Sequence, residues 1–168
     1  MANLRLPDGT MLLPTTADGS GKTAARELSV AILAARFNDF IVNPMLDGAL
    51  EVWRNSGGDP ARVTLIRVPG AFELPLAAQR FAASGRFDCL VALGCVIRGD
   101  TPHFDFVAGE AARGITQASL HTGVPIAFGV LTVNTLEQAQ ERADPARLNK
   151  GGEAMVTAIE MALLLQQV

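Results

Sequence analysis

Hydrophobic residues are spaced along this chain in two alternating ways. Short apolar runs of the kind found in strands occupy about residues 28–35, 63–68, 87–94 and 126–132. Elsewhere apolar residues recur three and four positions apart, the period of amphipathic helices. These helical stretches cover about residues 40–55, 72–83 and 106–121, a short segment from residue 135, and residues 153–166. Alternation of this kind predicts parallel strands joined by right-handed helical crossovers.

The strand runs are apolar at nearly every position, which predicts burial on both faces of a sheet. We therefore expect an α/β domain of three layers, with a four-stranded parallel sheet flanked by helices. Residues 27–168 would form this single domain. Residues 1–26 show no sustained period and are rich in Pro and Gly, so they are expected to form an arm that is flexible or docks on a neighbour.

Residues 153–166 are apolar nearly all round, which is unusual for a helix that faces solvent. We expect another subunit to cover this helix, and the composition points the same way. The 168 residues are 49% hydrophobic, and a folded monomer would hide such a chain with difficulty. Association with copies of itself is therefore expected.

Charge and hydropathy exclude some partners. The formal net charge is −3 and the Lys and Arg residues are scattered, so no nucleic-acid partner is expected. No apolar run approaches the ~20 residues that span a bilayer, and no signal segment is evident, so we expect a cytoplasmic protein that does not bind membranes. Cys89 and Cys95 would lie roughly 20 Å apart on one strand, too far to bridge, and are expected to be buried thiols.

Ligands of open parallel sheets bind beyond the carboxyl ends of the strands. Four chemically informative clusters follow the predicted strands. They are residues 36–38, residues 69–73, residues 94–106 and residues 132–134. The topology therefore predicts that these clusters converge in space.

The segment Arg98-Gly-Asp-Thr101 lies at a strand-to-helix turn, where free backbone N–H groups and the positive end of a helix favour an anion. Gly99 permits a close backbone approach or a positive φ. The segment matches neither a Walker loop nor a GxGxxG motif. A tight turn capped by Asp100 or Thr101 is the alternative interpretation.

His103 follows this turn, and its unperturbed pKa of ~6.5 suits proton transfer near neutral pH. A structural role at the start of the helix is the alternative, and His121 is expected to be a capping or surface residue. Phe37, Phe72 and Phe128 lie near strand ends, where an aromatic ring could stack on a planar heterocycle or pack in the core.

Several ordered motifs taken together resemble the lumazine synthase family. They are RFNDFI from Arg36, VPGAFELP from Val68, LGCVIRGDTPH from Leu93, GVPIAFG from Gly123 and NKG from Asn149. The resemblance covers about residue 28 to the end of the chain. It implies a flavodoxin-like fold and an enzyme that condenses 5-amino-6-ribitylaminouracil with 3,4-dihydroxy-2-butanone 4-phosphate. The product would be 6,7-dimethyl-8-ribityllumazine, the precursor of riboflavin, and no metal or redox cofactor is implied.

The resemblance also assigns roles to individual residues. Proton transfer falls to His103. The heterocycle and its ribityl chain are assigned to Phe37, Asn38, Ala71, Phe72, Glu73, Val96 and Ile97. Phosphate is assigned to Gly99, Asp100, Thr101 and Arg142. The neighbouring subunit would contribute Phe128, Lys150 and Glu153, whereas solvated helix charges are the alternative for Arg142 and Lys150. Arg98 receives no role beyond bracing the loop.

The resemblance implies a homo-oligomer with active sites between subunits. The connection from Asp144 to Leu148 departs from the glycine- and lysine-containing turn of family members that build icosahedral shells, so a pentamer is favoured over a decamer or a shell of about sixty subunits. Two other functions are considered: a non-catalytic protein that binds a lumazine or flavin, and a generic flavodoxin-like module for a nucleotide phosphate.

Overall fold

A parallel sheet forms the centre of the chain. The computed structural model describes residues 4–5, 11–12 and 25–168. The four strands run in the order β4-β3-β5-β6 and are all parallel. Their bounds are Val30–Ala35 for β3, Val63–Val68 for β4, Cys89–Ile97 for β5 and Ile126–Val133 for β6. The predicted four-stranded parallel sheet is therefore confirmed.

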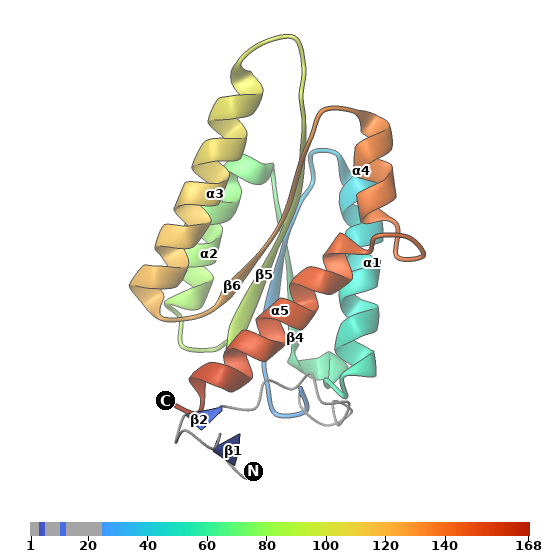
Figure 1. Ribbon diagram of the computed structural model, residues 1–168. Coiled ribbons are helices and arrows are strands. Elements are labelled where there is room, and N and C mark those ends of the chain that lie inside the picture. Colours follow the sequence, from blue (N-terminus) through green and yellow to red (C-terminus); the bar gives the residue numbers. More distant parts are fainter. Residues whose placement is uncertain (1–3, 6–10, 13–24) are drawn as a thin grey trace.

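Helices cover both faces of this sheet (Figure 1). One face carries α2 (Leu74–Ala82), preceded by the short 3-10 helix η2 (Ala71–Glu73), and α3 (His103–Thr122). The other carries α1 (Asp39–Asn55), α4 (Leu136–Ala143) and α5 (Lys150–Leu165). A second 3-10 helix, η1 (Pro60–Arg62), precedes β4. These layers confirm the predicted three-layer α/β architecture.

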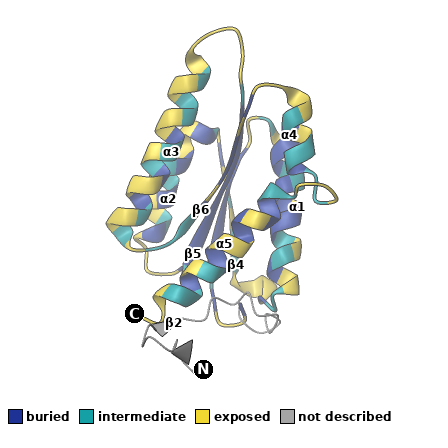
Figure 2. Cartoon of the chain, in the orientation of Figure 1, coloured by how far each residue is buried: buried dark blue, intermediate teal, exposed yellow. Residues whose placement is uncertain are grey.

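The side chains of β3 alternate between two hydrophobic cores. Val30, Ile32 and Ala34 pack on the side of α1 and α5, whereas residues 31, 33 and 35 pack on the side of α2 and α3. Both central strands are buried almost throughout, as predicted, but the edge strands β4 and β6 are not (Figure 2). Burial on both faces was thus wrong for the edge strands, because each has a neighbour on only one side.

Helix α5 lies close against α1. A Cβ at Gly151 would overlap the backbone carbonyl of Met45, so only glycine allows this approach. Asn149 precedes the helix at φ 43° and its side-chain oxygen accepts a hydrogen bond from the Gly152 N–H at 3.0 Å. This packing gives the Asn-Lys-Gly motif a structural reason that is independent of any ligand.

Part of α5 stays uncovered within one chain. Met161 and Leu165 are exposed and, with Leu120 of α3, line an open groove of about 390 Å³ beside the start of β6. The proposal that another subunit covers α5 remains a prediction. In the part of the chain that the structure describes, no helix has the length and apolarity needed to cross a membrane.

The expected arm, residues 1–26, lies mostly outside the described residues. Within it, β1 (Leu4–Arg5) and β2 (Met11–Leu12) pair in antiparallel fashion, with Leu4 opposite Leu12. This pairing was not anticipated, because the sequence there has no alternating pattern long enough to indicate a strand.

Candidate active site

A cavity of about 370 Å³ opens at the carboxyl ends of β3, β4 and β5. The connection after β3 leads to β4 on one side of the sheet, and the connection after β5 leads to β6 on the other side. The β3–β5 pair is therefore the topological switch point, where flavodoxin-like sheets bind ligands. The residues that line it are Phe37, Gly70, Ala71, Phe72, Glu73, Cys95, Val96, Ile97, Gly99, Thr101, His103, Phe104 and Val107. Three of the four predicted clusters therefore line one space, which we call the switch-point cavity. The fourth, residues 132–134, does not line it but contacts Arg98 of the third cluster.

Two exposed phenylalanines form its aromatic wall. Phe37 is 71% exposed and Phe72 is 56% exposed, so neither packs in the core. Phe37 follows β3, and its backbone N–H donates to the Pro69 carbonyl at 3.0 Å, which joins the ends of β3 and β4. Both rings line the same cavity, where a flat apolar surface suits stacking on a planar ligand.

Asn38 stands beside this wall but is not among the lining residues. Its backbone is left-handed, with φ 59°, and its side-chain N–H group donates to the Cys95 carbonyl at 3.0 Å. That bond ties the start of α1 to the end of β5. The amide oxygen of Asn38 has no such bond within the described residues and could accept one from a ligand hydroxyl.

The turn between β5 and α3 leaves its backbone donors unused. Among the hydrogen bonds of the described chain, none uses the N–H groups of Gly99, Asp100 or Thr101. Neither Asp100 nor Thr101 caps α3, whose N-cap position is held by Pro102 without a side-chain hydrogen bond. The capped-turn interpretation is therefore wrong, and free donors beside a helix start suit an anion.

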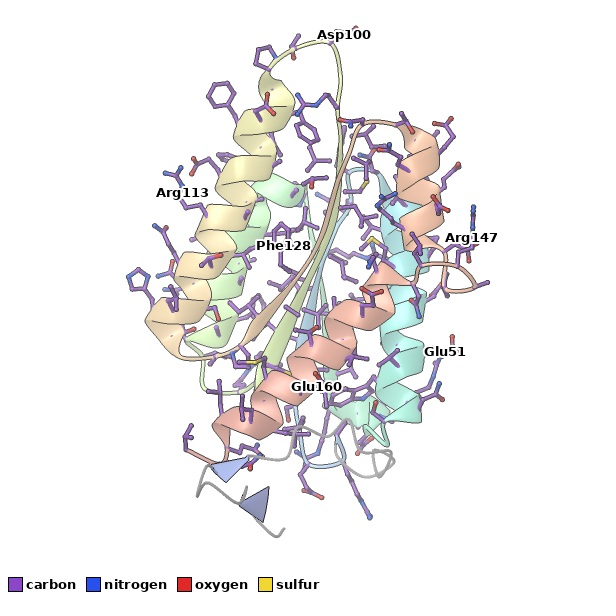
Figure 3. All side chains as sticks on the ribbon, viewed as in Figure 1. Glu51, Asp100, Arg113, Phe128, Arg147 and Glu160 are labelled. Atoms are coloured by element: carbon purple, nitrogen blue, oxygen red, sulfur yellow. The ribbon has the colours of Figure 1, made fainter. Side chains whose placement is uncertain are left out.

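Gly99 and Asp100 differ from expectation in detail. Gly99 does not have a positive φ, and a Cβ added there would meet no other atom within 4 Å, so neither backbone strain nor close packing within the described residues requires glycine at this position. Asp100 lies at the tip of the loop and does not line the cavity (Figure 3). Its side chain is therefore not placed to bind a ligand in this cavity, and its backbone N–H has no partner among the hydrogen bonds of the described residues.

His103 is the first residue of α3 and lines the cavity together with Thr101. Four lining residues had no role assigned from the sequence: Gly70, Cys95 and Phe104, which lie within the predicted clusters, and Val107, which lies outside them. Val107 lies four positions after His103 on the same helix face, so helical spacing alone could have identified it, whereas Phe104 is the next residue and helical spacing does not place it on that face. Cys95 is buried, as expected, with 3% of its surface exposed, and it also lines the switch-point cavity.

Both cysteines are free and buried. Burial raises the pKa of Cys89 to about 12, with the nearby Asp88 charge adding to the effect, and raises that of Cys95 to about 11. Such thiols are protonated at neutral pH and are poor nucleophiles. Within the described residues, no group of three or more His, Cys, Asp or Glu side chains is arranged to hold a metal ion.

The remaining predicted residues lie elsewhere in the chain. Phe128, Lys150 and Glu153 line a second cavity, of about 390 Å³, along the edge strand β6 and the start of α5. Phe128 is 45% exposed, so it is not a core residue, and Figure 3 shows it on the face of β6 between α3 and α5. Lys150 Nζ lies 2.6 Å from Glu153 Oε2. We call this space the edge-strand cavity.

Arg142 lines neither of these two cavities. It lies in α4, and one guanidinium N–H donates to the Gln138 carbonyl at 3.1 Å. Helix α4 packs on the sheet face opposite α2 and α3. A single chain therefore does not bring Arg142 to the turn at Gly99–Thr101 in its own switch-point cavity.

The fold and the switch-point cavity define an α/β enzyme that acts on small molecules at the carboxyl edge of a parallel sheet. Residues 27–166 match the protein family described as 6,7-dimethyl-8-ribityllumazine synthase. The chain belongs to this family. Its function is accordingly the condensation that forms 6,7-dimethyl-8-ribityllumazine in riboflavin biosynthesis.

Two curated relatives carry the same name. One, from Syntrophus aciditrophicus (strain SB), is 51% identical over 156 residues, which cover 93% of this chain and 100% of the relative. The other, from Chlorobium luteolum (strain DSM 273 / BCRC 81028 / 2530), is 51% identical over 148 residues, covering 88% of this chain and 96% of the relative. The similarity therefore extends over nearly the whole length of each protein.

Proposed function

We propose that the chain joins 5-amino-6-ribitylaminouracil to 3,4-dihydroxy-2-butanone 4-phosphate in a site shared by two subunits. The switch-point cavity of one subunit would meet the edge-strand cavity of the next. The products are 6,7-dimethyl-8-ribityllumazine, inorganic phosphate and water.

One observation carries the shared site. The described residues that line the switch-point cavity include no Lys and no Arg, although one substrate bears a phosphate. The cations expected to meet that phosphate are Arg142 in α4 and Lys150 in α5, the two helices that follow the edge strand β6 in the chain. Isolated buried phosphate charge is costly without cationic partners, so a second chain that presents these helices would complete the site.

The uracil substrate fits the aromatic wall of the switch-point cavity. The ring of Phe37 would stack on the pyrimidine, and the backbone at residues 71–72 and 96–97 would bind its polar edge. Glu73 and the free amide oxygen of Asn38 can accept hydrogen bonds from the ribityl hydroxyls. Phe128 of the neighbour would close the opposite side of the heterocycle.

The phosphate substrate fits the turn after β5. Its phosphate would accept hydrogen bonds from the free N–H groups of residues 99–101 and from the Thr101 hydroxyl. The guanidinium of Arg142, supplied by the neighbour, can bind two phosphate oxygens at once. Lys150 adds a second positive charge, currently paired with Glu153.

The chemistry then needs proton transfers more than a strong nucleophile. The uracil amine attacks the ketone to form an imine with loss of water, phosphate leaves, and ring closure with loss of a second water completes the pyrazine. His103 lies beside the phosphate turn, where it can take the proton of the amine and return protons to the leaving oxygens. Much of the acceleration comes from holding two reactants together and excluding water.

The proposed activity is tested by mixing purified protein with both substrates and following lumazine absorbance. The proposal requires absorbance that grows with time and depends on both substrates. Purified protein that carries bound flavin and forms no lumazine would instead support a binding protein or a nucleotide-phosphate module.

We also propose that the assembly is a pentamer. The uncovered groove of α5 and the incomplete switch-point cavity both need a neighbour, and a closed ring supplies one to every subunit. Light scattering on the purified protein measures the mass directly. A mass equal to that of about sixty subunits would contradict the pentamer but not the shared site.

A further inference from the structure

Arg98 stands at the base of the turn that is proposed to hold phosphate. Its guanidinium group forms two hydrogen bonds with Asp105 in the first turn of α3, from Nη2 to Oδ1 at 2.8 Å and from Nη1 to Oδ2 at 3.3 Å. Its Nε donates to Asn134 Oδ1 at 3.3 Å. A bidentate pair of this geometry fixes orientation as well as distance.

These contacts connect three separate elements. The backbone N–H of Arg98 donates to the Val133 carbonyl at 2.9 Å, which extends the pairing of β5 with β6 by one residue. Asn134 follows β6, and Asp105 belongs to α3. The ends of both strands and the start of the helix are therefore joined through one side chain.

The same side chain spans the turn in sequence. Residues 99–101 and His103 all lie between Arg98 and Asp105, so the ion pair closes the loop that carries them. Within the described residues, neither Asp100 nor Thr101 forms a side-chain hydrogen bond that could hold the loop in its place. The Arg98–Asp105 pair is thus the side-chain contact that joins the two ends of this loop.

The guanidinium also covers an aromatic ring of the cavity. Its central carbon lies 4.0 Å from the ring centroid of Phe104, and Phe104 lines the switch-point cavity next to His103. The hydrogen bond from Arg98 lowers the pKa of Asp105, and the same bond raises the pKa of Arg98, so both groups are charged at neutral pH.

We propose that Arg98 and Asp105 are positioning residues for the phosphate-bearing substrate. They hold the turn at Gly99–Thr101, and His103 behind it, in the geometry that binds phosphate. This inference rests on the proposed function. Three of the five guanidinium N–H groups of Arg98, one each at Nε, Nη1 and Nη2, already donate to Asn134 and Asp105, so we assign Arg98 to holding the turn rather than to binding phosphate.

A stabilising role alone does not account for the cluster. The side chains of Arg98 and Asp105 are 42% and 59% exposed, and ion pairs with that much solvent contribute little to folding stability. Loss of the pair should therefore leave the fold intact and change how phosphate is bound.

The test compares Asp105→Asn, Arg98→Gln and the double variant with wild type in the full-length oligomer. The matched control is Glu110→Gln, which removes the exposed Glu110–Arg113 pair on the same helix, whose Arg113 projects outward from α3 (Figure 3). Four quantities are measured: kcat, the KM of each substrate, the Kd of inorganic phosphate by calorimetry, and the thermal midpoint.

Each single variant is expected to raise the KM of the butanone phosphate and the Kd of inorganic phosphate about tenfold. The KM of the uracil substrate should change less than about twofold, and the thermal midpoint should stay near that of Glu110→Gln. Because the two residues act as one unit, the double variant should be no worse than the worse single variant.

Arg98→Lys serves as a further check, because lysine keeps the charge but cannot form the two-point contact. It should resemble Arg98→Gln. Wild-type phosphate affinity in Arg98→Lys, or in both single variants, would overturn the inference. Additive losses in the double variant would also overturn it, because they would indicate that Arg98 binds phosphate directly. Absence of condensation in wild type would instead overturn the proposed function, and phosphate calorimetry would still test the positioning role.

Discussion

The switch-point cavity and the edge-strand cavity differ in what they offer a substrate. The first has an aromatic wall, a carboxylate, a histidine and free backbone donors, but none of its described lining residues is Lys or Arg. The second has an aromatic ring beside the Lys150–Glu153 ion pair on the start of a helix. One half can orient a heterocycle and move protons, and the other can supply positive charge. This difference in chemistry is the basis of the proposed site shared between two subunits.

The largest single effect is expected on the proton-transfer side. His103→Ala should lower kcat by ~10²-fold to 10⁴-fold, the usual share of one acid–base group, while substantial turnover remains because proximity is retained. Steady-state lumazine formation measures this loss. His121→Ala, on the exposed last turn of the same helix, is the matched control. Loss of all turnover in His103→Ala, or no loss, would contradict the assigned role.

A smaller effect is expected on the cationic side, and it should appear in binding. Arg142→Ala should raise the KM of the butanone phosphate about tenfold to a hundredfold, because a charge-assisted hydrogen bond contributes about 1.5–3 kcal/mol. The KM of the uracil substrate should stay near its wild-type value. Arg147→Ala, which removes an exposed pair with Glu141, is the control. An unchanged KM for the butanone phosphate would remove the role of Arg142.

A substitution in the aromatic wall should weaken binding of the uracil substrate rather than of the butanone phosphate. Phe37→Leu keeps an apolar side chain but loses the flat ring, so the KM of the uracil substrate should rise about threefold to tenfold. Phe40→Leu changes another exposed phenylalanine, outside the switch-point cavity, and should have no such effect. Equal effects of the two substitutions would show that stacking at Phe37 is not needed.

The smallest effect is expected from the thiols. Since burial raises the pKa of Cys95 to about 11 and that of Cys89 to about 12, both remain protonated until the pH exceeds those values. The raised folded-state pKa stabilises the fold below the ordinary thiol pKa, and this contribution declines as pH rises through the folded values. Iodoacetamide at pH 8 should leave native protein unmodified by mass spectrometry and label both thiols after unfolding. Rapid native labelling would contradict this.

The alternation of strands and helices was sufficient to predict the layers and the four-stranded sheet. Segment ends were harder, and the reasons are local. Strand β5 continues to Ile97 because residues 94–97 pair with β6. This tertiary pairing cannot be predicted from the sequence, where Gly94 indicates a turn. Helix α5 begins at Lys150, before the predicted residue 153, because the Asn149 cap and the close approach to α1 outweigh the poor helix propensity of its glycines.

The candidate site was predicted unevenly for a similar reason. Residues that directly follow strands, such as Phe37 and Glu73, reach the switch-point cavity because topology alone places them there. A bracing role for Arg98 was expected, but its partners could not be predicted, since the bonds to Asp105 and to the distant Asn134 depend on side-chain geometry. Arg142 could not be assigned to its own cavity or a neighbour's, because the side of the sheet on which α4 packs is a tertiary property.

The shared site is tested most directly by combining two defective subunits. One carries Phe37→Ala with His103→Ala and the other Arg142→Ala with Lys150→Ala, and the two are co-expressed with different affinity tags and purified through both. Each variant alone should be nearly inactive. Random co-assembly should restore about a quarter of the sites, and hence about a quarter of wild-type lumazine formation. Mixed oligomers no more active than the average of their two parents would contradict a site shared between subunits.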